Sequence, residues 1–242
     1  MYKKIYFDEL DSTNKEAKKI AEQNKKELKE LVVISKTQFK GQGNHNRIWK
    51  SHEGGLYFSI LLRPEAMLPL FSLMAGVAVI ETLKELVNLD FKIKWPNDVL
   101  FNKNKISGIL TECKFIGNTL DYVIVGCGIN INQKDFDDFK NYKATSLYLL
   151  TGKEFDLNSV LDIYLKHFNK LYFNYINSNS EEILDKLNKY SVLKDKKVIV
   201  DVGENIFIIG KVIGINSDGG LIIKKENQKN EIIYSGSILS FE

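Results

Sequence analysis

The change of pattern near residue 190 is the feature that most constrains the fold. Before it, apolar runs of helix length alternate with β-rich runs. After it, "KKVIVDVGENIFIIGKVIGINSDGGLIIKKENQKNEIIYSGSILSF" holds four or five short β runs separated by "GEN", "NSDGG" and "ENQKN". Turn-forming residues at this close spacing are typical of the hairpins of a small barrel. We therefore predict a mixed α+β domain over residues 1–190, followed by a small β-barrel over residues 191–242.

Within the first part, the apolar pattern predicts helices and strands in alternation. A capping box, formed by Thr13 and Glu16, is expected to open the first helix, in "DSTNKEAKKIAEQ". Residues 91–112, "FKIKWPNDVLFNKNKISGILTE", look like a hairpin of two apolar runs around a polar turn. The other expected strands are 4–10, 31–38, 56–64 and 121–132, and the other expected helices are 70–88, 157–176 and 180–189.

Composition excludes several classes of protein. The net charge is +3, and lysine and glutamate interleave along the helix-like stretches, so nothing indicates a nucleic-acid-binding surface. Two cysteines, Cys113 and Cys127, are expected to be buried reduced thiols. No apolar run is long enough to span a membrane, and no signal segment opens the sequence, so we expect a cytoplasmic protein.

Polar residues gather at the start of the first helix. Ser12, Thr13 and Asn14 either cap that helix or present hydroxyl and amide groups to a neutral polar ligand. Taken alone, the capping interpretation is the simpler one.

The loop "GQGNHNRIW" is a surface connection or a ligand-binding loop. Gly41 and Gly43 would let the backbone approach a ligand, Arg47 could meet a phosphate, and Trp49 could close over an apolar portion. A Gly-x-Gly pair by itself is weak support for function.

Two further clusters lie on strands. Asn97 and Asp98, in "KWPND", suit a strand end, but Asp98 could also support Mg²⁺ directly or through water. Lys105 opens the buried run "ISGIL", where a lysine normally has an anionic partner. In "GCGININ", Gly126 and Gly128 indicate close approach by another chain or a ligand, and Asn130 follows them.

The order of these motifs resembles the motif series of the biotin–protein ligases. The motifs are "STN", "TQFKGQGNHNRIW", "KWPND", "KISGIL" and "GCGININ". The likeness spans residues 11–132, and "KWPND" followed by Lys-x-x-Gly-Ile-Leu is its most specific part. The resemblance implies a class II synthetase-like catalytic fold of the biotin/lipoate ligase type, with a C-terminal SH3-like β-barrel.

The resemblance also implies an activity. Biotin's carboxylate would attack the α-phosphate of ATP, in the presence of Mg²⁺, to give biotinyl-5′-AMP. A lysine of a biotin carboxyl carrier domain, from acetyl-CoA carboxylase or a related carboxylase, would then take the biotin. Family members can form homodimers. Because "STN" begins at residue 12, we expect a monofunctional ligase without a DNA-binding domain.

Residue roles follow from the resemblance by motif position. Lys105 would bridge biotin's carboxylate and the α-phosphate and act as the electrostatic catalyst. Asp98 would also support the Mg²⁺ ion. The residues expected to bind biotin are Ser12, Thr13, Asn14, Gln38, Gln42, Gly43, Asn44, Trp49 and Lys105, and those expected to bind the nucleotide are Gly41, Arg47, Asn97, Asp98 and Asn130.

The loop departs from the family pattern, which is commonly Gly-Arg-Gly-Arg, because Gln42 and Asn44 replace two cations. We expect weaker retention of the adenylate, or recruitment of Lys36, Lys40 or Lys50 in their place. Two alternatives stay open. One is a lipoate or octanoate ligase of the same fold, although its usual Arg-Arg-x-Ser-Gly-Gly-Gly loop is missing from the sequence. The other is a non-catalytic biotin-binding protein.

Overall fold

The computed structural model describes residues 2–24, 30–44, 47–65, 69–136, 143–177 and 179–242. The chain divides into two compact units, one of residues 1–67 and 103–165 and the other of residues 68–102 and 166–242. The boundary expected near residue 190 stays a prediction. Among the described residues, no helix is both long and apolar enough to cross a membrane.

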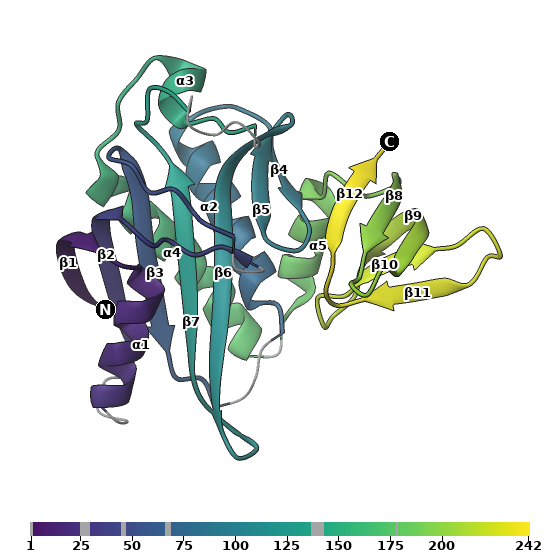
Figure 1. Cartoon of the computed structure of the whole chain (residues 1–242), viewed down its shortest axis with the longest axis horizontal. Coiled ribbons are helices and arrows are strands. Elements are labelled where there is room, and N and C mark those ends of the chain that lie inside the picture. Colours follow the sequence, from purple (N-terminus) through teal and green to yellow (C-terminus); the bar gives the residue numbers. More distant parts are fainter. Residues whose placement is uncertain (1, 25–29, 45–46, 66–68, 137–142, 178) are drawn as a thin grey trace. The chain divides into compact units, whose positions relative to one another are not determined.

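The first unit is built on a mixed sheet with the strand order β1-β2-β3-β7-β6 (Figure 1). β1 and β2 are parallel, and the other neighbours are antiparallel. The strands are β1 (Lys3–Leu10), β2 (Glu30–Gln38), β3 (Gly55–Leu62), β6 (Asn104–Ile116) and β7 (Thr119–Asn130). β3 is buried along its whole length, which its near-continuous apolar sequence predicts.

Helices of the first unit pack on both faces of this sheet. On one face, Ala17 and Ala21 of α1 (Thr13–Gln23) join a core with Leu31, Leu61 and neighbouring apolar side chains. On the other face, Tyr164 of α4 (Leu157–Ile176) packs edge-on against Phe58, with ring centroids 4.8 Å apart. A short helix, α3 (Leu147–Thr151), was not predicted, because five residues are too few for a helical period to be visible.

The second unit contains α2 (Phe71–Leu86), α5 (Glu181–Tyr190) and the hairpin of β4 (Phe91–Lys94) and β5 (Asp98–Phe101). The hairpin expected over 91–112 needs a correction in its first run, which is divided into two strands. Its first run folds back on itself, and its second run lies in β6, which pairs with β7.

The C-terminal residues form a separate five-stranded sheet with the order β11-β10-β9-β8-β12. Its antiparallel strands are β8 (Lys197–Asp201), β9 (Phe207–Ile215), β10 (Leu221–Lys224), β11 (Asn230–Ile233) and β12 (Ser237–Phe241). In β9, exposed and buried residues alternate, so one face of this small sheet supplies its core. The predicted fold class, a mixed α+β domain with a C-terminal β domain, is confirmed.

Candidate functional site

The first helix begins at a buried polar group. Ser12, Thr13 and Asn14 are all buried, and Ser12 stands at the N-cap with an extended backbone. Within the described part of the chain, the Ser12 side chain makes no capping hydrogen bond. The predicted capping box of Thr13 and Glu16 is wrong. The Thr13 side chain contacts Gln38 of β2 and Ser59 of β3, and the Glu16 backbone amide donates to the Ser12 carbonyl.

Gln38, at the end of β2, holds the start of the helix. Its Oε1 accepts the backbone N–H of Thr13 at 2.8 Å and lies 3.2 Å from Thr13 Oγ1. Its Nε2 donates to Ser51 Oγ at 2.8 Å, and Ser51 Oγ donates to the Trp49 carbonyl at 3.2 Å. The two ends of the Gln38 amide are therefore distinguished by their partners, and the structure brings Thr13 and Gln38 together.

Ser59, in the middle of β3, is a member of this cluster that the sequence did not reveal. Its fully buried Oγ lies 2.7 Å from Thr13 Oγ1 and 2.6 Å from Asn14 Oδ1. The Asn14 amide donates in turn to the Leu110 carbonyl at 3.3 Å and to Glu112 Oε2 at 2.7 Å. The one available signal was a single hydroxyl inside the apolar run "LYFSILL".

Glycines in β6 and β7 let side chains lie directly on the sheet. A Cβ at Gly126 would stand 2.1 Å from Asn14 Oδ1, and one at Gly128 would stand 2.4 Å from Trp49 Nε1. Gly108 is the register partner of Gly128, and a Cβ there would meet Trp49 Cζ3 at 2.8 Å. Gly126 and Gly128 do mark a close approach, but the approaching groups are side chains of this chain, whereas another chain or a ligand was expected.

Trp49 brings the glycine-rich loop to Lys105. The Lys105 Nζ lies 5.0 Å from the centre of the Trp49 ring, within cation–π range. The indole Nε1 is buried and has no hydrogen-bond partner among the described residues. Because a buried N–H without an acceptor is costly, this atom favours a ligand that supplies one.

The described arms of the loop, residues 38–44 and 47–51, pair in antiparallel fashion through the bridges Gln38–Ser51 and Gln42–Ile48. The Trp49 amide donates to the Gly41 carbonyl at 2.9 Å, and a Cβ at Gly41 would stand 2.3 Å from the Trp49 carbonyl oxygen. Gly41 is therefore required by the hairpin itself. The remaining predicted residues of the loop are exposed Gln42, half-buried Gly43 and Asn44, and exposed Arg47.

Asn130 holds the backbone that carries Lys105. Its Nδ2 donates to the carbonyl oxygens of Thr145 at 3.0 Å and of Lys105 at 3.4 Å, and its Oδ1 accepts from Gln133 at 3.2 Å. The Lys105 backbone amide donates to the Lys143 carbonyl at 2.8 Å, and this bond further fixes the start of β6. A nucleotide-binding role for Asn130 stays a prediction, while its observed contacts stabilise the position of Lys105.

Asn97 and Asp98 belong to the second unit. Asn97 lies in the turn between β4 and β5, after a cis peptide bond between Trp95 and Pro96, and Asp98 is the first residue of β5. The buried Trp95 indole donates to the Gly219 carbonyl at 2.9 Å. Both predicted residues are half-buried at a strand end, and their role stays a prediction.

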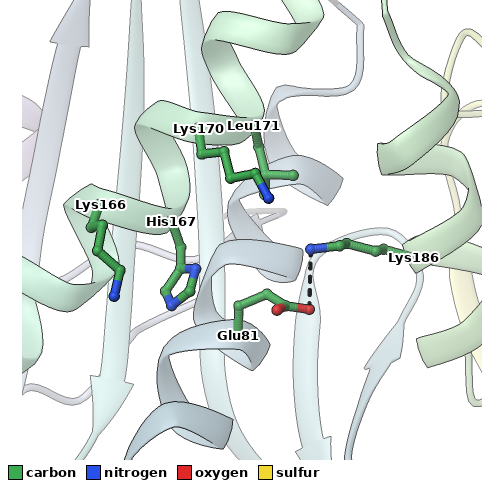
Figure 2. Close-up of a pocket in the computed structure, with 6 residues that line it drawn as sticks. All are labelled: Glu81, Lys166, His167, Lys170, Leu171 and Lys186. Carbon is green, nitrogen blue, oxygen red and sulfur yellow. Dashed lines mark ion pairs between the residues drawn. The ribbon is translucent and has the colours of Figure 1, made fainter.

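A cavity of about 400 Å³ lies in the second unit, and none of the residues that line it is a predicted site residue. Figure 2 shows cationic side chains of α4 and α5 at this cavity, with Glu81 of α2 facing Lys186. Its lining residues are Glu81, Lys166, His167, Lys170, Leu171 and Lys186.

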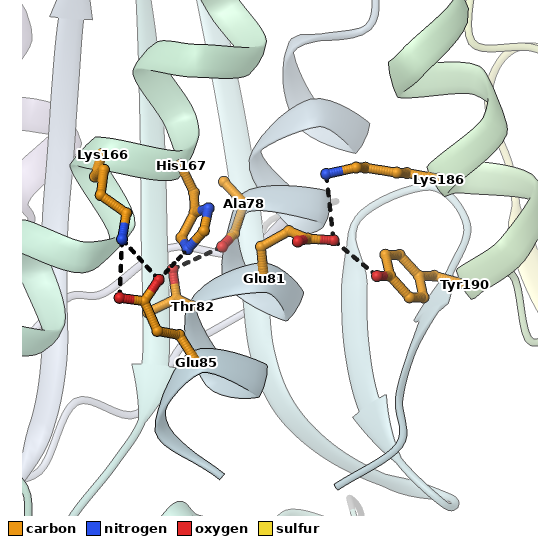
Figure 3. Close-up of polar contacts among 8 residues, drawn as sticks. All are labelled: Ala78, Glu81, Thr82, Glu85, Lys166, His167, Lys186 and Tyr190. Carbon is orange, nitrogen blue, oxygen red and sulfur yellow. Dashed lines mark hydrogen bonds and ion pairs between the residues drawn. The ribbon is translucent and has the colours of Figure 1, made fainter. Parts of the chain in front are cut away.

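Ion pairs around this cavity join α2 to α5 and to the part of α4 that belongs to the second unit (Figure 3). Glu85 lies 2.8 Å from both Lys166 Nζ and His167 Nε2, and the hydrogen bonds from Lys166 and then His167 lower the pKa of this carboxyl. Glu81 accepts from Tyr190 at 2.7 Å and pairs with Lys186 at 3.4 Å. Because each of these lysines already has a carboxylate partner, we interpret the cluster as structural.

Comparisons with known proteins agree with the motif series. Residues 6–130 match the biotin/lipoate A/B protein ligase family. The bifunctional ligase/repressor BirA of Bacillus subtilis is 35% identical over 240 residues, which are 97% of this chain and 73% of that protein. The chloroplastic biotin–protein ligase 1 of Arabidopsis thaliana is 26% identical over 226 residues, 87% of this chain and 60% of that protein.

Among solved structures, the biotin protein ligase from Aquifex aeolicus in complex with biotin and ATP superposes with a TM-score of 0.83. It is 34% identical in sequence, and the match covers 100% of this chain and 99% of that one. The chain belongs to the biotin/lipoate A/B protein ligase family.

Proposed function

We propose that this protein is a biotin–protein ligase, which uses ATP to attach biotin to a lysine of a biotin carboxyl carrier domain. The observation that carries the proposal is the meeting of Thr13, Gln38, Trp49 and Lys105 on one sheet, in a chain so similar to a ligase that binds biotin and ATP. Because ATP is required, we place the reaction in the cytoplasm.

The buried polar cluster suits the head group of biotin. A ureido ring offers two N–H donors and one carbonyl acceptor, and it is neutral, so its recognition requires acceptors and donors without charge. Thr13 Oγ1 and Gln38 Oε1 supply acceptors, and the second N–H of the Gln38 amide supplies a donor. Ser12 and Asn14 adjoin this pair at the same helix start.

Lys105 would act where negative charge accumulates. In the first step, a carboxylate oxygen of biotin forms a bond to the α-phosphorus of ATP, and the bond from that phosphorus to pyrophosphate breaks. In the second step, the neutral ε-amine of the carrier lysine attacks the acyl carbon, and AMP leaves. An ammonium group held near both reacting groups stabilises the charge of the pentavalent phosphorus. Trp49 would cover the adenylate and exclude water from it.

Asp98 and Asn97 would serve the nucleotide and its metal ion. Among the described residues, no three histidine, cysteine, aspartate or glutamate side chains gather to hold a metal. A lone carboxylate nevertheless fits Mg²⁺, which usually keeps several waters and binds through one or two carboxylates and the substrate's phosphates. Mg²⁺ would neutralise phosphate charge when bound. By motif position, Gly41, Arg47 and Asn130 would also bind the nucleotide.

The altered loop predicts a further property. Gln42 and Asn44 stand where the family commonly has arginines, so the loop hairpin holds phosphate with fewer cations. Of the lysines that could compensate, Lys36 is already paired with Asp8, at 2.5 Å. We therefore expect faster release of biotinyl-AMP than from a ligase with the arginine-rich loop. Slower release would contradict this expectation.

Mass spectrometry of the purified protein with Mg·ATP, and either biotin or lipoate, tests the proposal. Biotinyl-AMP formed only with biotin is the expected result. Lipoyl-AMP would assign the chain to the lipoate branch of its family. Biotin binding without any adenylate would indicate a binding protein.

Lys105→Ala separates a catalyst from a binder. We expect adenylation to fall by about 100-fold or more, as after the loss of an electrostatic group that stabilises a transition state, while biotin binding weakens less. Lys103→Ala, which removes an exposed lysine two residues away, is the control and should leave both unchanged. Equal losses of binding and adenylation in Lys105→Ala would contradict the catalytic role.

A further inference from the structure

The hydrogen-bond geometry around Ser59 determines the directions of the Ser59 and Thr13 hydroxyl protons. Asn14 Nδ2 faces two acceptors, the Leu110 carbonyl and the Glu112 carboxylate. The Asn14 amide oxygen must therefore face Ser59, whose Oγ lies 2.6 Å away. An amide oxygen can only accept, so the single proton of Ser59 goes to Asn14.

The Thr13 hydroxyl has one arrangement left. Ser59 Oγ and Thr13 Oγ1 are 2.7 Å apart, which requires a proton between them. Because the Ser59 proton is already committed to Asn14, Thr13 must donate to Ser59. The longer contact from Thr13 Oγ1 to Gln38 Oε1, at 3.2 Å, is then not the main direction of the Thr13 proton.

We propose that Ser59 is a positioning residue that turns the Thr13 hydroxyl away from the substrate and makes Thr13 Oγ1 an obligate acceptor for a ureido N–H of biotin. Ser59 is fully buried and contacts both Thr13 and Asn14, and it would act on the substrate through these two side chains. This inference rests on the proposed function, since it assigns the head group of biotin to Thr13.

Proton direction has a consequence for specificity. A ligand with an N–H at this position completes the chain of donors from ligand to Thr13, Ser59 and Asn14. A ligand with an oxygen there places one lone pair against another, and the buried hydroxyl cannot turn to donate without breaking its bond to Ser59. Sites that hydrogen-bond a substrate group reject analogues that lack it far more strongly than apolar pockets do.

The test compares biotin with its two cyclic carbamate analogues, in each of which oxygen replaces one ureido N–H. We measure their dissociation constants by calorimetry with the wild-type protein, Ser59→Ala and Ser107→Ala. Ser107 is the matched control, because it is equally buried on a strand of the same sheet and its hydroxyl has no hydrogen-bond partner among the described residues.

For the wild-type protein, we expect one carbamate to bind about 100-fold more weakly than biotin. In Ser59→Ala, we expect the biotin affinity to fall by about tenfold and the discrimination against that carbamate to fall below about tenfold, because the Thr13 hydroxyl can then rotate to donate. Ser107→Ala should keep both wild-type values. A merely structural role for Ser59 would weaken all three ligands by one common factor, and that result would overturn the proposal.

Neutron diffraction of the deuterated wild-type protein with biotin gives a second measurement that requires no variant. A deuteron on Thr13 Oγ1 directed at Ser59 supports the proposal, and one directed at Gln38 or at biotin refutes it. If the wild-type protein binds no biotin in calorimetry, the proposed function fails. If it binds biotin but Ser59→Ala discriminates as the wild type does, only the present inference fails.

Discussion

Gly128→Ala would remove Trp49 from its place on the sheet without changing any residue proposed to contact substrate. The new Cβ would lie 2.4 Å from Trp49 Nε1, 2.5 Å from Cε2 and 2.8 Å from Cζ2. These distances are far below van der Waals contact, and the strand cannot yield, because Gly128 pairs with Tyr57 on one side and Gly108 on the other. The indole must therefore move.

The cost of this movement follows from the surface that the indole buries. A fully covered indole removes roughly 200 Å² from water, at about 25 cal/mol per Å². Trp49 is only partly exposed, and if the sheet accounts for about half of the covered indole area, this contact contributes about 2.5 kcal/mol. Loss of that contribution corresponds to a decrease of about 50- to 100-fold in kcat/KM for adenylation, if Trp49 acts from this position.

Pyrophosphate release at varied biotin concentration measures the effect, in a double-mutant cycle with Trp49→Ala. In the Trp49→Ala background, Gly128→Ala should change kcat/KM by less than about twofold, because the clash no longer exists. Gly214→Ala is the control, since a Cβ at this strand glycine approaches only the flexible end of Asn188, at 3.3 Å. Additive effects of Gly128→Ala and Trp49→Ala, or a Gly128→Ala variant with wild-type kcat/KM, would refute the reasoning.

Three further predictions concern stability. Burial raises the pKa of the Cys127 thiol to about 12. The protonated thiol therefore stabilises the folded state fully below pH 9, and this contribution is lost between pH 9 and 12, as the thiol of the unfolded chain ionises first. Replacement by alanine should make the unfolding free energy measured in urea less steep over that range, by about 1.4 kcal/mol per pH unit, and an unchanged slope would contradict this. Arg63 is largely buried and lies 2.5 Å from Asp121. Arg63→Ala should therefore lower the free energy of unfolding by about 3 kcal/mol. Urea unfolding with an unchanged m-value measures this, and a loss below about 1 kcal/mol would count against a strong pair. The pKa of Glu85 is lowered by Lys166, so the stability it contributes is lost as pH falls below the ordinary carboxyl range. Glu85→Gln should remove that acid-side loss in thermal unfolding at low salt, while an acid-side loss equal to that of the wild type would refute it.

Patterns of short range were predictable from the sequence. The helices over 157–176 and 180–189 were expected within one residue of α4 and α5, because their apolar period is long and regular. Four or five C-terminal strands were predicted, because their turns carry glycine, asparagine or aspartate, and the structure has five.

Contacts between distant residues were not predictable. The Thr13 hydroxyl fits a local capping box, but its partners are 25 and 46 residues away, in β2 and β3. A capping hydroxyl and a buried hydroxyl have the same sequence signature, and only tertiary packing decides between them. Ser59 was missed for the same reason.

The three glycines Gly108, Gly126 and Gly128 explain why polar chemistry can lie on a buried sheet. Asn14 and Trp49 reach the candidate site from a helix and from a loop, and each lies directly on backbone where a side chain would otherwise stand. Their positions are therefore set by the register of β6 and β7, which is held by ladder hydrogen bonds along both strands. A shift of that register by one residue would move every glycine to the opposite face. The geometry of the site is for this reason coupled to the cooperative stability of the whole sheet, and a variant that leaves the sheet intact but fills one glycine tests the site alone.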